Sequence, residues 1–283
     1  MQLLVVGAGS MGRWFADTVE RAAPGEIDLA FADTDDAAAA DAAAELDART
    51  VPVDGTERFD VVCLAVPISA VEASVAAQAG RVREAVVDVT GVMAPPLAAM
   101  RTHVPGRERV SFHPLFAPVN APGNIAVTAD EPGPVTDRLR AALDAAGNSL
   151  FEATAAEHDR AMETVQSSAH AAVIAYALAA REVRPEFHTP VSGSLAELVE
   201  TVTGGTPRVY REIQTTFDGA ERVADAATRL AAADDETFDA LYREASGSVG
   251  SRDDDTGDTD GKESVDDTDD SGRTGDRAPR DRR

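Results

Sequence analysis

The sequence contains a single cysteine, Cys63, among its 283 residues. One cysteine excludes a disulfide bond within the chain and a zinc site built from cysteine pairs. No apolar run approaches the roughly 18 residues that a membrane-spanning helix needs, and no charged segment followed by an apolar one resembles a secretory leader. We therefore expect a cytoplasmic protein with no membrane partner.

Positive charge is also scarce, since 26 basic residues face 50 acidic ones and the formal net charge is −24. Only one basic residue, Lys262, is a lysine. The negative electrostatic potential of such a chain repels the phosphates of nucleic acids and anionic lipids, so neither is an expected partner. Acidic excess with almost no lysine and much alanine resembles the cytosolic proteins of salt-loving organisms. In about 1 M salt the screening length falls to about 3 Å, which allows such a chain to stay compact.

Short apolar runs alternate with helix-length stretches over the first half of the chain. The runs lie at 2–6, 28–33, 61–66, 85–89, 110–113, 124–128 and 149–152. This alternation is typical of βαβ units. It predicts an α/β fold in which residues 1–152 form a Rossmann-type domain with a doubly wound, mostly parallel sheet.

The pattern changes after residue 152. Neither proline nor glycine interrupts residues 155–181, and further helical stretches follow at 195–203, 207–217, 219–233 and 235–245. We therefore predict an all-helical second domain over residues 153–245. Residues 246–283 consist mainly of Asp, Gly, Ser, Thr and Arg. Such a composition cannot bury a core and predicts a disordered acidic tail.

A glycine-rich segment joins the first predicted strand to the first predicted helix. It comprises Gly7, Ala8, Gly9, Ser10, Met11 and Gly12. The glycines permit a tight turn, let the backbone approach a pyrophosphate and bring the helix against the sheet. Asp33 ends the next strand, where an acid accepts hydrogen bonds from a ribose 2′-hydroxyl and repels a 2′-phosphate. The segment predicts a binding site for NAD rather than NADP.

Val66 and Pro67 follow the apolar run at 61–66, at the carboxyl end of a predicted strand. Ligands of open α/β sheets bind in the crevice at these ends. The two residues either flank the nicotinamide side of the cofactor or form an ordinary strand-to-helix loop.

His113 ends a predicted strand and is followed directly by Pro114. A histidine held at this edge of the sheet can act as a general base, whereas a buried imidazole without such a setting is structural. On the long predicted helix, Gln166 and His170 share one face and suggest a site. We interpret His158 as structural, and Asp159 as an acid that the helix dipole favours near the amino terminus.

Together these segments resemble the prephenate dehydrogenase family of tyrosine biosynthesis. The matching stretches are GAGSMG, AVPISA, VDVTGVM, FHPLFAP, AAEHDRAMETVQSSAH and TPRVYREI, in order over residues 3–215. The resemblance implies a Rossmann domain, a helical domain that forms a homodimer, and NAD-dependent oxidation of prephenate to 4-hydroxyphenylpyruvate with loss of carbon dioxide. It implies that His113 is catalytic, that Gln166 and His170 line the substrate pocket, and that no metal takes part.

Two positions depart from the pattern of the family. Gly91-Val92-Met93 stands where the family usually has Ser-Val-Lys, so we predict that Thr90 supplies the pocket hydroxyl. The arginine that binds a substrate carboxylate in relatives aligns near Gly193. We predict that Arg211, or else Arg160 or Arg208, takes its place. Two alternatives stay open, an arogenate dehydrogenase and a non-catalytic NAD-binding regulatory module.

Overall fold

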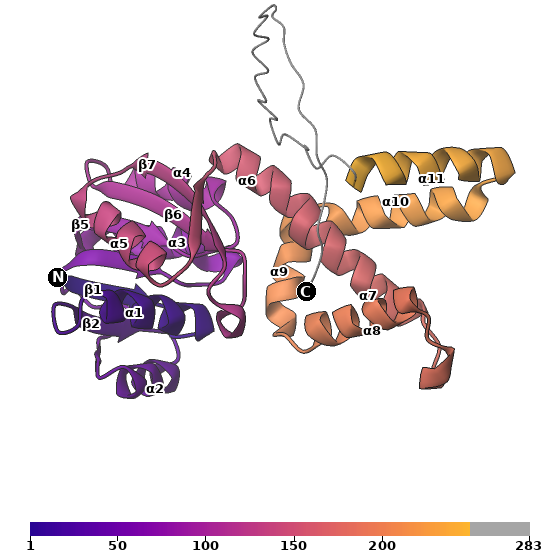
Figure 1. The fold of residues 1–283 in the computed structure, drawn as a ribbon. Helices are drawn as coiled ribbons and strands as arrows, with labels where there is room; N and C mark the ends of the chain where they lie inside the picture. Colours follow the sequence, from indigo (N-terminus) through magenta and orange to yellow (C-terminus); the bar gives the residue numbers. More distant parts are fainter. Residues whose placement is uncertain (250–283) are drawn as a thin grey trace, which may run out of the picture. The chain divides into compact units, whose positions relative to one another are not determined.

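The computed structural model describes residues 1–249 (Figure 1). Contacts between Cα atoms divide the chain into unit 1, residues 1–231, and a second unit that begins at residue 232. The described part of the second unit contains helix α11 (Asp235–Val249), which continues past its predicted end at residue 245. Most of the predicted tail, from residue 250 onward, lies outside the described residues.

An eight-stranded sheet of order β3-β2-β1-β4-β5-β6-β7-β8 forms the first part of unit 1. The strands are β1 (Gln2–Val6), β2 (Asp28–Ala32), β3 (Arg49–Thr50), β4 (Phe59–Leu64), β5 (Val82–Asp88), β6 (Glu108–Pro114), β7 (Asn124–Glu131) and β8 (Ser149–Glu152). Strand β7 is antiparallel to β6, and the other neighbours pair in parallel. The predicted doubly wound, mostly parallel sheet is confirmed.

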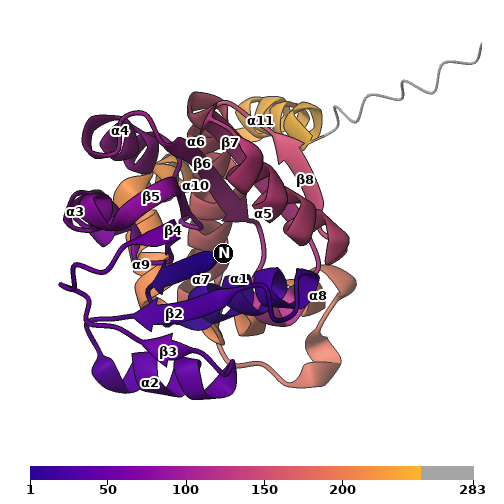
Figure 2. The same cartoon turned by 90° about the vertical axis from the view of Figure 1, so that its left-hand side faces the viewer.

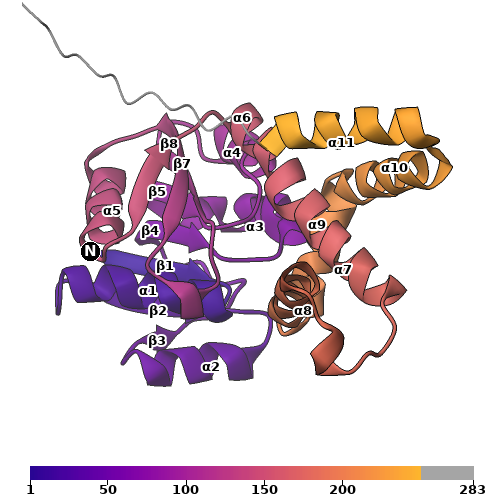
Figure 3. The same cartoon turned by 45° about the vertical axis from the view of Figure 1, so that its right-hand side comes forward.

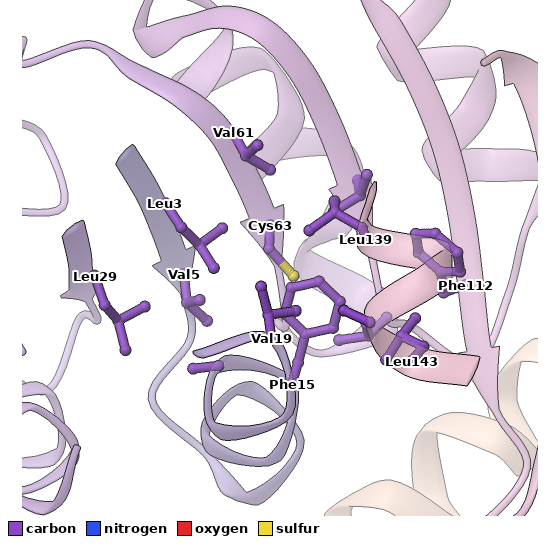
Figure 4. Packing of buried hydrophobic residues seen from close by; sticks show 14 of the residues in the cluster. Leu3, Val5, Phe15, Val19, Leu29, Val61, Cys63, Phe112, Leu139 and Leu143 are labelled. Atoms are coloured by element: carbon purple, nitrogen blue, oxygen red, sulfur yellow. The ribbon is translucent and has the colours of Figure 1, made fainter. Parts of the chain in front are cut away.

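Helices cover both faces of this sheet, which explains why its strands are apolar on both sides. Those on one face are α1 (Ser10–Ala22), α2 (Asp36–Glu45) and α5 (Pro134–Ala145), whereas α3 (Val71–Gln78) and α4 (Ala94–His103) lie on the other (Figure 2). On the face covered by α1, α2 and α5, Phe15 of α1 packs near Val5 and the buried Cys63, and Leu139 of α5 belongs to the same cluster (Figure 4). Burial raises the pKa of the Cys63 thiol, so this residue acts as a small apolar side chain.

The carboxyl ends of β1 and β4 are adjacent at the centre of the sheet. The helices that follow these strands, α1 and α3, pass to opposite faces. Such a reversal opens a crevice at the carboxyl ends of the strands. The ends of β5 and β6 extend the same edge and carry Asp88 and His113.

Residues 155–231 are helical apart from their connecting loops. The helices that begin in this stretch are α6 (Ala155–Met162), α7 (Ala169–Ala179), α8 (Pro190–Thr203), α9 (Pro207–Thr216) and α10 (Gly219–Ala232) (Figure 3). A π-helical segment, Glu163–Ser168, joins α6 to α7 without a break, so the long predicted helix is continuous but locally underwound. Helix α8 begins before its predicted start at 195, because Thr189 and Ser192 form a capping box. Within residues 1–249, no helix has the length and apolar character needed to cross a membrane.

Candidate active site

The glycine-rich turn has the geometry that a bound dinucleotide requires. Gly7 has a φ of +104°, and a Cβ there would collide with the carbonyl oxygen of Ala65. A Cβ at Gly12 would collide with the carbonyl oxygen of Gly7, so helix and strand pack at backbone distance. Gly9, the N-cap of α1, faces open space. The free backbone N–H groups at the start of α1 can therefore donate hydrogen bonds to an anion.

Asp33 follows β2 and holds the glycine turn in place. Its carboxylate accepts hydrogen bonds from the backbone N–H of Ala8 at 2.7 Å and of Asp35 at 2.9 Å. The side chain is half-buried and borders the crevice beside Gly7 and Gly9. A carboxylate has lone pairs for more than two donors, so it can also accept a bond from a ribose hydroxyl.

A pocket of about 730 Å³ occupies this crevice. The predicted cofactor residues that line it are Gly7, Gly9, Asp33, Val66 and Pro67. The other three, Ser10, Met11 and Gly12, form the first turn of α1 and are not lining residues. Its volume falls within the usual range for ligand pockets, about 300–1,000 Å³.

His113, near the end of β6, forms a hydrogen-bonded chain with two residues of α6. Its Nδ1 lies 2.8 Å from Nε2 of His158, and Nδ1 of His158 lies 2.8 Å from Oδ1 of Asp159. Asp159 also accepts hydrogen bonds from the backbone N–H groups of Met93 at 2.9 Å and Ala94 at 3.0 Å. Both imidazoles are almost fully buried, with 6% of His113 and 2% of His158 exposed.

The partners in this chain decide which nitrogen of His113 carries a proton. Asp159 receives two backbone N–H groups and has no proton to donate, so Nδ1–H of His158 donates to it. Nε2 of His158 then accepts the Nδ1–H of His113, which leaves Nε2 of His113 unprotonated. The side-chain amide of Gln166 agrees with this assignment, because its Nε2 lies 3.4 Å from Nε2 of His113 and is a donor.

Burial decides the charge of the same ring. Burial and the neighbouring His158 lower the pKa of His113 to about 3, although Asp159 opposes the shift. Burial acts to raise the pKa of Asp159, but the hydrogen bonds from His158 and from the backbone of Met93 and Ala94 hold it below its ordinary value. At neutral pH the site therefore contains an uncharged His113 with an unshared electron pair on Nε2, supported by a carboxylate.

Gln166 and His170 lie on the helix beyond α6, both half-buried. The π-helical segment carries Gln166, and its amide oxygen is buried with no hydrogen-bond partner within residues 1–249. Nδ1 of His170 is likewise buried and unpartnered in the described structure, while its ring packs edge-on against Tyr210 of α9. Buried polar atoms without a partner are costly unless a ligand satisfies them. The two atoms are therefore available to a polar substrate.

The hydroxyl of Thr90, predicted to lie in the substrate pocket, is hydrogen-bonded to Asp88. It donates to Asp88 Oδ1 at 2.6 Å, and the backbone N–H of Thr90 bonds to the same oxygen at 3.0 Å. Thr90 is buried, and its hydroxyl supports the loop after β5. Next to it Gly91 leaves room, since a Cβ there would lie 3.7 Å from Nε2 of His113.

The structure also shows where His158, Asp159 and Arg211 lie. The interpretation of His158 as structural agrees with its burial, and both His158 and Asp159 are hydrogen-bonded into the chain that ends at His113. Arg211, predicted to bind the substrate carboxylate, lines the crevice together with Gly7 and Gly9. The stretch AAEHDRAMETVQSSAH, which carries the family resemblance, contains both His158 and Asp159.

Asp88 and Glu212 were not among the predicted site residues. Asp88 is fully buried, and burial raises its pKa to about 7 despite hydrogen bonds from Thr90. Its Oδ2 has no hydrogen-bond partner in the described structure. Glu212 of α9 accepts the backbone N–H of Ile68 at 2.8 Å. Residues 1–249 contain no group of three or more His, Cys, Asp or Glu side chains that could hold a metal ion.

A dinucleotide crevice bordered by an acid, at the same edge of the sheet as a buried histidine, is typical of nicotinamide-dependent dehydrogenases of the Rossmann class. The profile described as "Prephenate dehydrogenase, nucleotide-binding domain" matches residues 19–127. The chain is 30% identical over 277 residues to a 4-amino-4-deoxyprephenate dehydrogenase from Streptomyces pristinaespiralis, covering 88% of this chain and 90% of that one. The chain belongs to the prephenate dehydrogenase family.

Two further comparisons agree with this assignment. A probable arogenate/prephenate dehydrogenase from Methanocaldococcus jannaschii is 26% identical over 178 residues, which cover 57% of this chain and 40% of that one. A crystal structure of prephenate dehydrogenase from Aquifex aeolicus, in complex with hydroxyphenyl propionate and NAD+, has the same fold. Its TM-score is 0.65 at 16% identity, over 88% of this chain and 93% of that one.

Proposed function

We propose that the protein catalyses the NAD-dependent oxidative decarboxylation of prephenate to 4-hydroxyphenylpyruvate, a step of tyrosine biosynthesis. The observation that carries the proposal is the hydrogen-bonded chain from His113 through His158 to Asp159, which leaves Nε2 of His113 to accept a proton. A dehydrogenase needs such an acceptor beside its cofactor, because removing a hydride from an alcohol carbon requires that the hydroxyl lose its proton.

The roles of the residues follow from this acceptor. NAD, when bound in the crevice, supplies the electrophile that accepts the hydride. Nε2 of His113 accepts the hydroxyl proton, and the carbonyl group that forms draws electrons from the bond to the ring carboxylate. Release of carbon dioxide then makes the ring aromatic, so the chain needs to supply only the base and the orientation. Gln166 and His170 bind polar groups of the substrate through atoms that have no other partner in the described structure.

A second candidate substrate is 4-amino-4-deoxyprephenate, which carries an amine in place of the hydroxyl. The relative that is 30% identical over 88% of the chain bears that activity in its name. Arogenate, which differs from prephenate only in its side chain, is the third compound to test.

An assay of NADH formation separates these substrates. Purified protein in molar KCl is supplied with NAD and, in turn, with prephenate, arogenate and 4-amino-4-deoxyprephenate. We expect the highest kcat/KM with prephenate. A higher value with either other compound would reassign the substrate, and no NADH with any of them, despite normal NADH binding, would favour a non-catalytic module.

His113→Asn tests the base directly. Asparagine keeps a side chain of similar size but removes the proton acceptor, so turnover should fall by about 10²–10⁴-fold. The dissociation constant for NADH, measured by fluorescence, should stay unchanged because His113 is not a lining residue of the cofactor pocket. Retention of most of the turnover would show that another group takes the proton.

We also propose that the helical part forms a homodimer in the cytoplasm. Helix α7 is rich in alanine and aliphatic residues yet has no buried residue, and Leu178 is 83% exposed. Val191 on α8 is 72% exposed, so apolar surface continues onto the helix packed against α7. Large exposed apolar surfaces mark interfaces. Light scattering after size-exclusion chromatography should give twice the mass of the 29.6 kDa chain.

A further inference from the structure

Helix α9 reaches the cofactor crevice from the helical part of unit 1. Three of its side chains, Arg208, Arg211 and Glu212, line the same pocket as Gly9 and Asp33. Glu212 fixes the helix there, since its carboxylate accepts the backbone N–H of Ile68 at 2.8 Å and lies 3.3 Å from the hydroxyl of Ser69. Ile68 and Ser69 follow directly on Pro67 in the loop after β4. The helix is therefore attached to one wall of the crevice.

The charged residues that line this pocket differ in whether other groups already hold them. Its acidic lining residues are Asp33, Asp35 and Glu212, and its basic lining residues are Arg208 and Arg211. Asp33 and Glu212 are already held by backbone N–H groups. Arg208 lies 3.6 Å from Glu212 with 57% of its side chain exposed. Arg211 has no ion pair or side-chain hydrogen bond to any residue in 1–249. Both guanidinium groups are thus available to an anion.

The anion that this crevice would receive is the pyrophosphate of a dinucleotide. In a chain of net charge −24, binding a doubly charged pyrophosphate requires local donors. The helix start at Gly9 provides backbone N–H groups on one side, and a guanidinium binds phosphate oxygens through charge-assisted and often bidentate hydrogen bonds. We propose that Arg208 and Arg211 bind the cofactor pyrophosphate from the helical side of the crevice. This inference rests on the proposed use of NAD, and it assigns Arg211 to the cofactor instead of the substrate.

The test is NADH binding without substrate, measured by fluorescence titration in molar KCl. Arg211→Gln and Arg208→Gln should each raise the dissociation constant for NADH by about tenfold, as expected for one lost hydrogen bond between charged groups. The double variant should lose more than either single one. Arg138→Gln is the matched control, because Arg138 is an exposed arginine of α5 outside the pocket lining, and its NADH affinity should equal that of the wild type.

Three outcomes would overturn the proposal. Unchanged NADH affinity together with a raised KM for prephenate would show that the arginines bind the substrate carboxylate. A loss of affinity for NADPH that exceeds the loss for NADH would place them at a 2′-phosphate. Unchanged affinity and unchanged KM would show that neither arginine touches a ligand. Because binding is measured without turnover, the result holds even if none of the proposed substrates is oxidised.

Discussion

Replacing Asp159 by asparagine should inactivate the enzyme although this side chain lies two hydrogen bonds away from Nε2 of His113. The carboxylate accepts three donors, namely Nδ1–H of His158 and the backbone N–H groups of Met93 and Ala94. An asparagine amide has only one acceptor oxygen, so its NH₂ group must face at least one of these donors. Oδ1 accepts both His158 and the N–H of Met93, whereas Oδ2 accepts the N–H of Ala94, so either placement of the amide leaves one backbone N–H against the NH₂ group. We expect the placement in which the NH₂ group replaces Oδ1 and faces His158.

That arrangement reverses the protons along the chain. Nδ1 of His158 becomes an acceptor, its Nε2–H donates to Nδ1 of His113, and the remaining proton of His113 moves to Nε2. The nitrogen that should accept the substrate proton is then occupied. Loss of a general base costs about 10²–10⁴ in rate, which corresponds to about 3–5 kcal/mol of transition-state stabilisation. A buried donor left unsatisfied costs a further 1–3 kcal/mol or so of folding stability.

Steady-state kinetics and NADH binding together provide the measurement. For Asp159→Asn we expect kcat to fall at least about a hundredfold, with NADH affinity unchanged. The double variant Asp159→Asn/His113→Asn should be no slower than His113→Asn alone, since residues that act as a unit are not additive. Glu157→Gln, which removes an exposed carboxylate from the same helical turn, serves as the control and should keep wild-type kinetics. A kcat within threefold of wild type, or losses that multiply in the double variant, would refute the proton arrangement.

Three further predictions concern the cofactor, a buried carboxyl and salt. Asp33→Ser should lower the preference for NAD over NADP, measured as the ratio of kcat/KM values, by about tenfold or more, because the carboxylate no longer repels a 2′-phosphate; a wild type that already prefers NADP would contradict this. Asp88→Asn should stabilise the fold at about pH 8 by up to about 4 kcal/mol, since the folded carboxyl keeps its proton to about pH 7 whereas the unfolded one ionises near 3.8; the gain in denaturant unfolding should shrink as the pH falls through 7 and vanish below about pH 4, and a gain independent of pH would exclude the explanation. The melting temperature should rise as KCl increases from about 0.1 M to about 2 M, because screening reduces the self-repulsion of a chain with net charge −24; a fall in melting temperature would refute the interpretation of the acidic composition.

The chain from His113 to Asp159 also connects two parts of unit 1. His113 belongs to the sheet, whereas His158 and Asp159 belong to α6, and Asp159 binds the first backbone N–H groups of α4. The same hydrogen bonds that orient the base therefore dock the helical part onto the sheet. A variant that weakens this docking affects both the stability of the interface and the protonation of His113, which is why NADH binding must accompany every kinetic test.

The sequence by itself determined the features that depend on neighbouring residues. Alternating apolar runs predicted the sheet, because a strand buried on both faces is encoded as one run of consecutive apolar residues. Gly7, Gly9 and Gly12 predicted the phosphate turn, because strand, turn and helix are contiguous in the sequence. Asp33 followed from its place at the end of the next strand. Candidate residues such as His113 were identifiable by type and by position at a strand end.

Only the tertiary structure decided which side chains meet. His158 contacts a histidine 45 residues away, and Glu212 contacts a backbone N–H 144 residues away, distances over which periodicity carries no information. The π-helical segment shifts Gln166 relative to its position in a regular helix, so the spacing of residues did not predict where its side chain lies. The antiparallel direction of β7 relative to β6 did not follow from the spacing either. Thr90 and Arg211 were identified by residue type, but only packing shows that the Thr90 hydroxyl meets Asp88 and that Arg211 lines the crevice beside Gly9. Residue type limits the chemistry that is available, whereas the packing of distant elements determines where it is used.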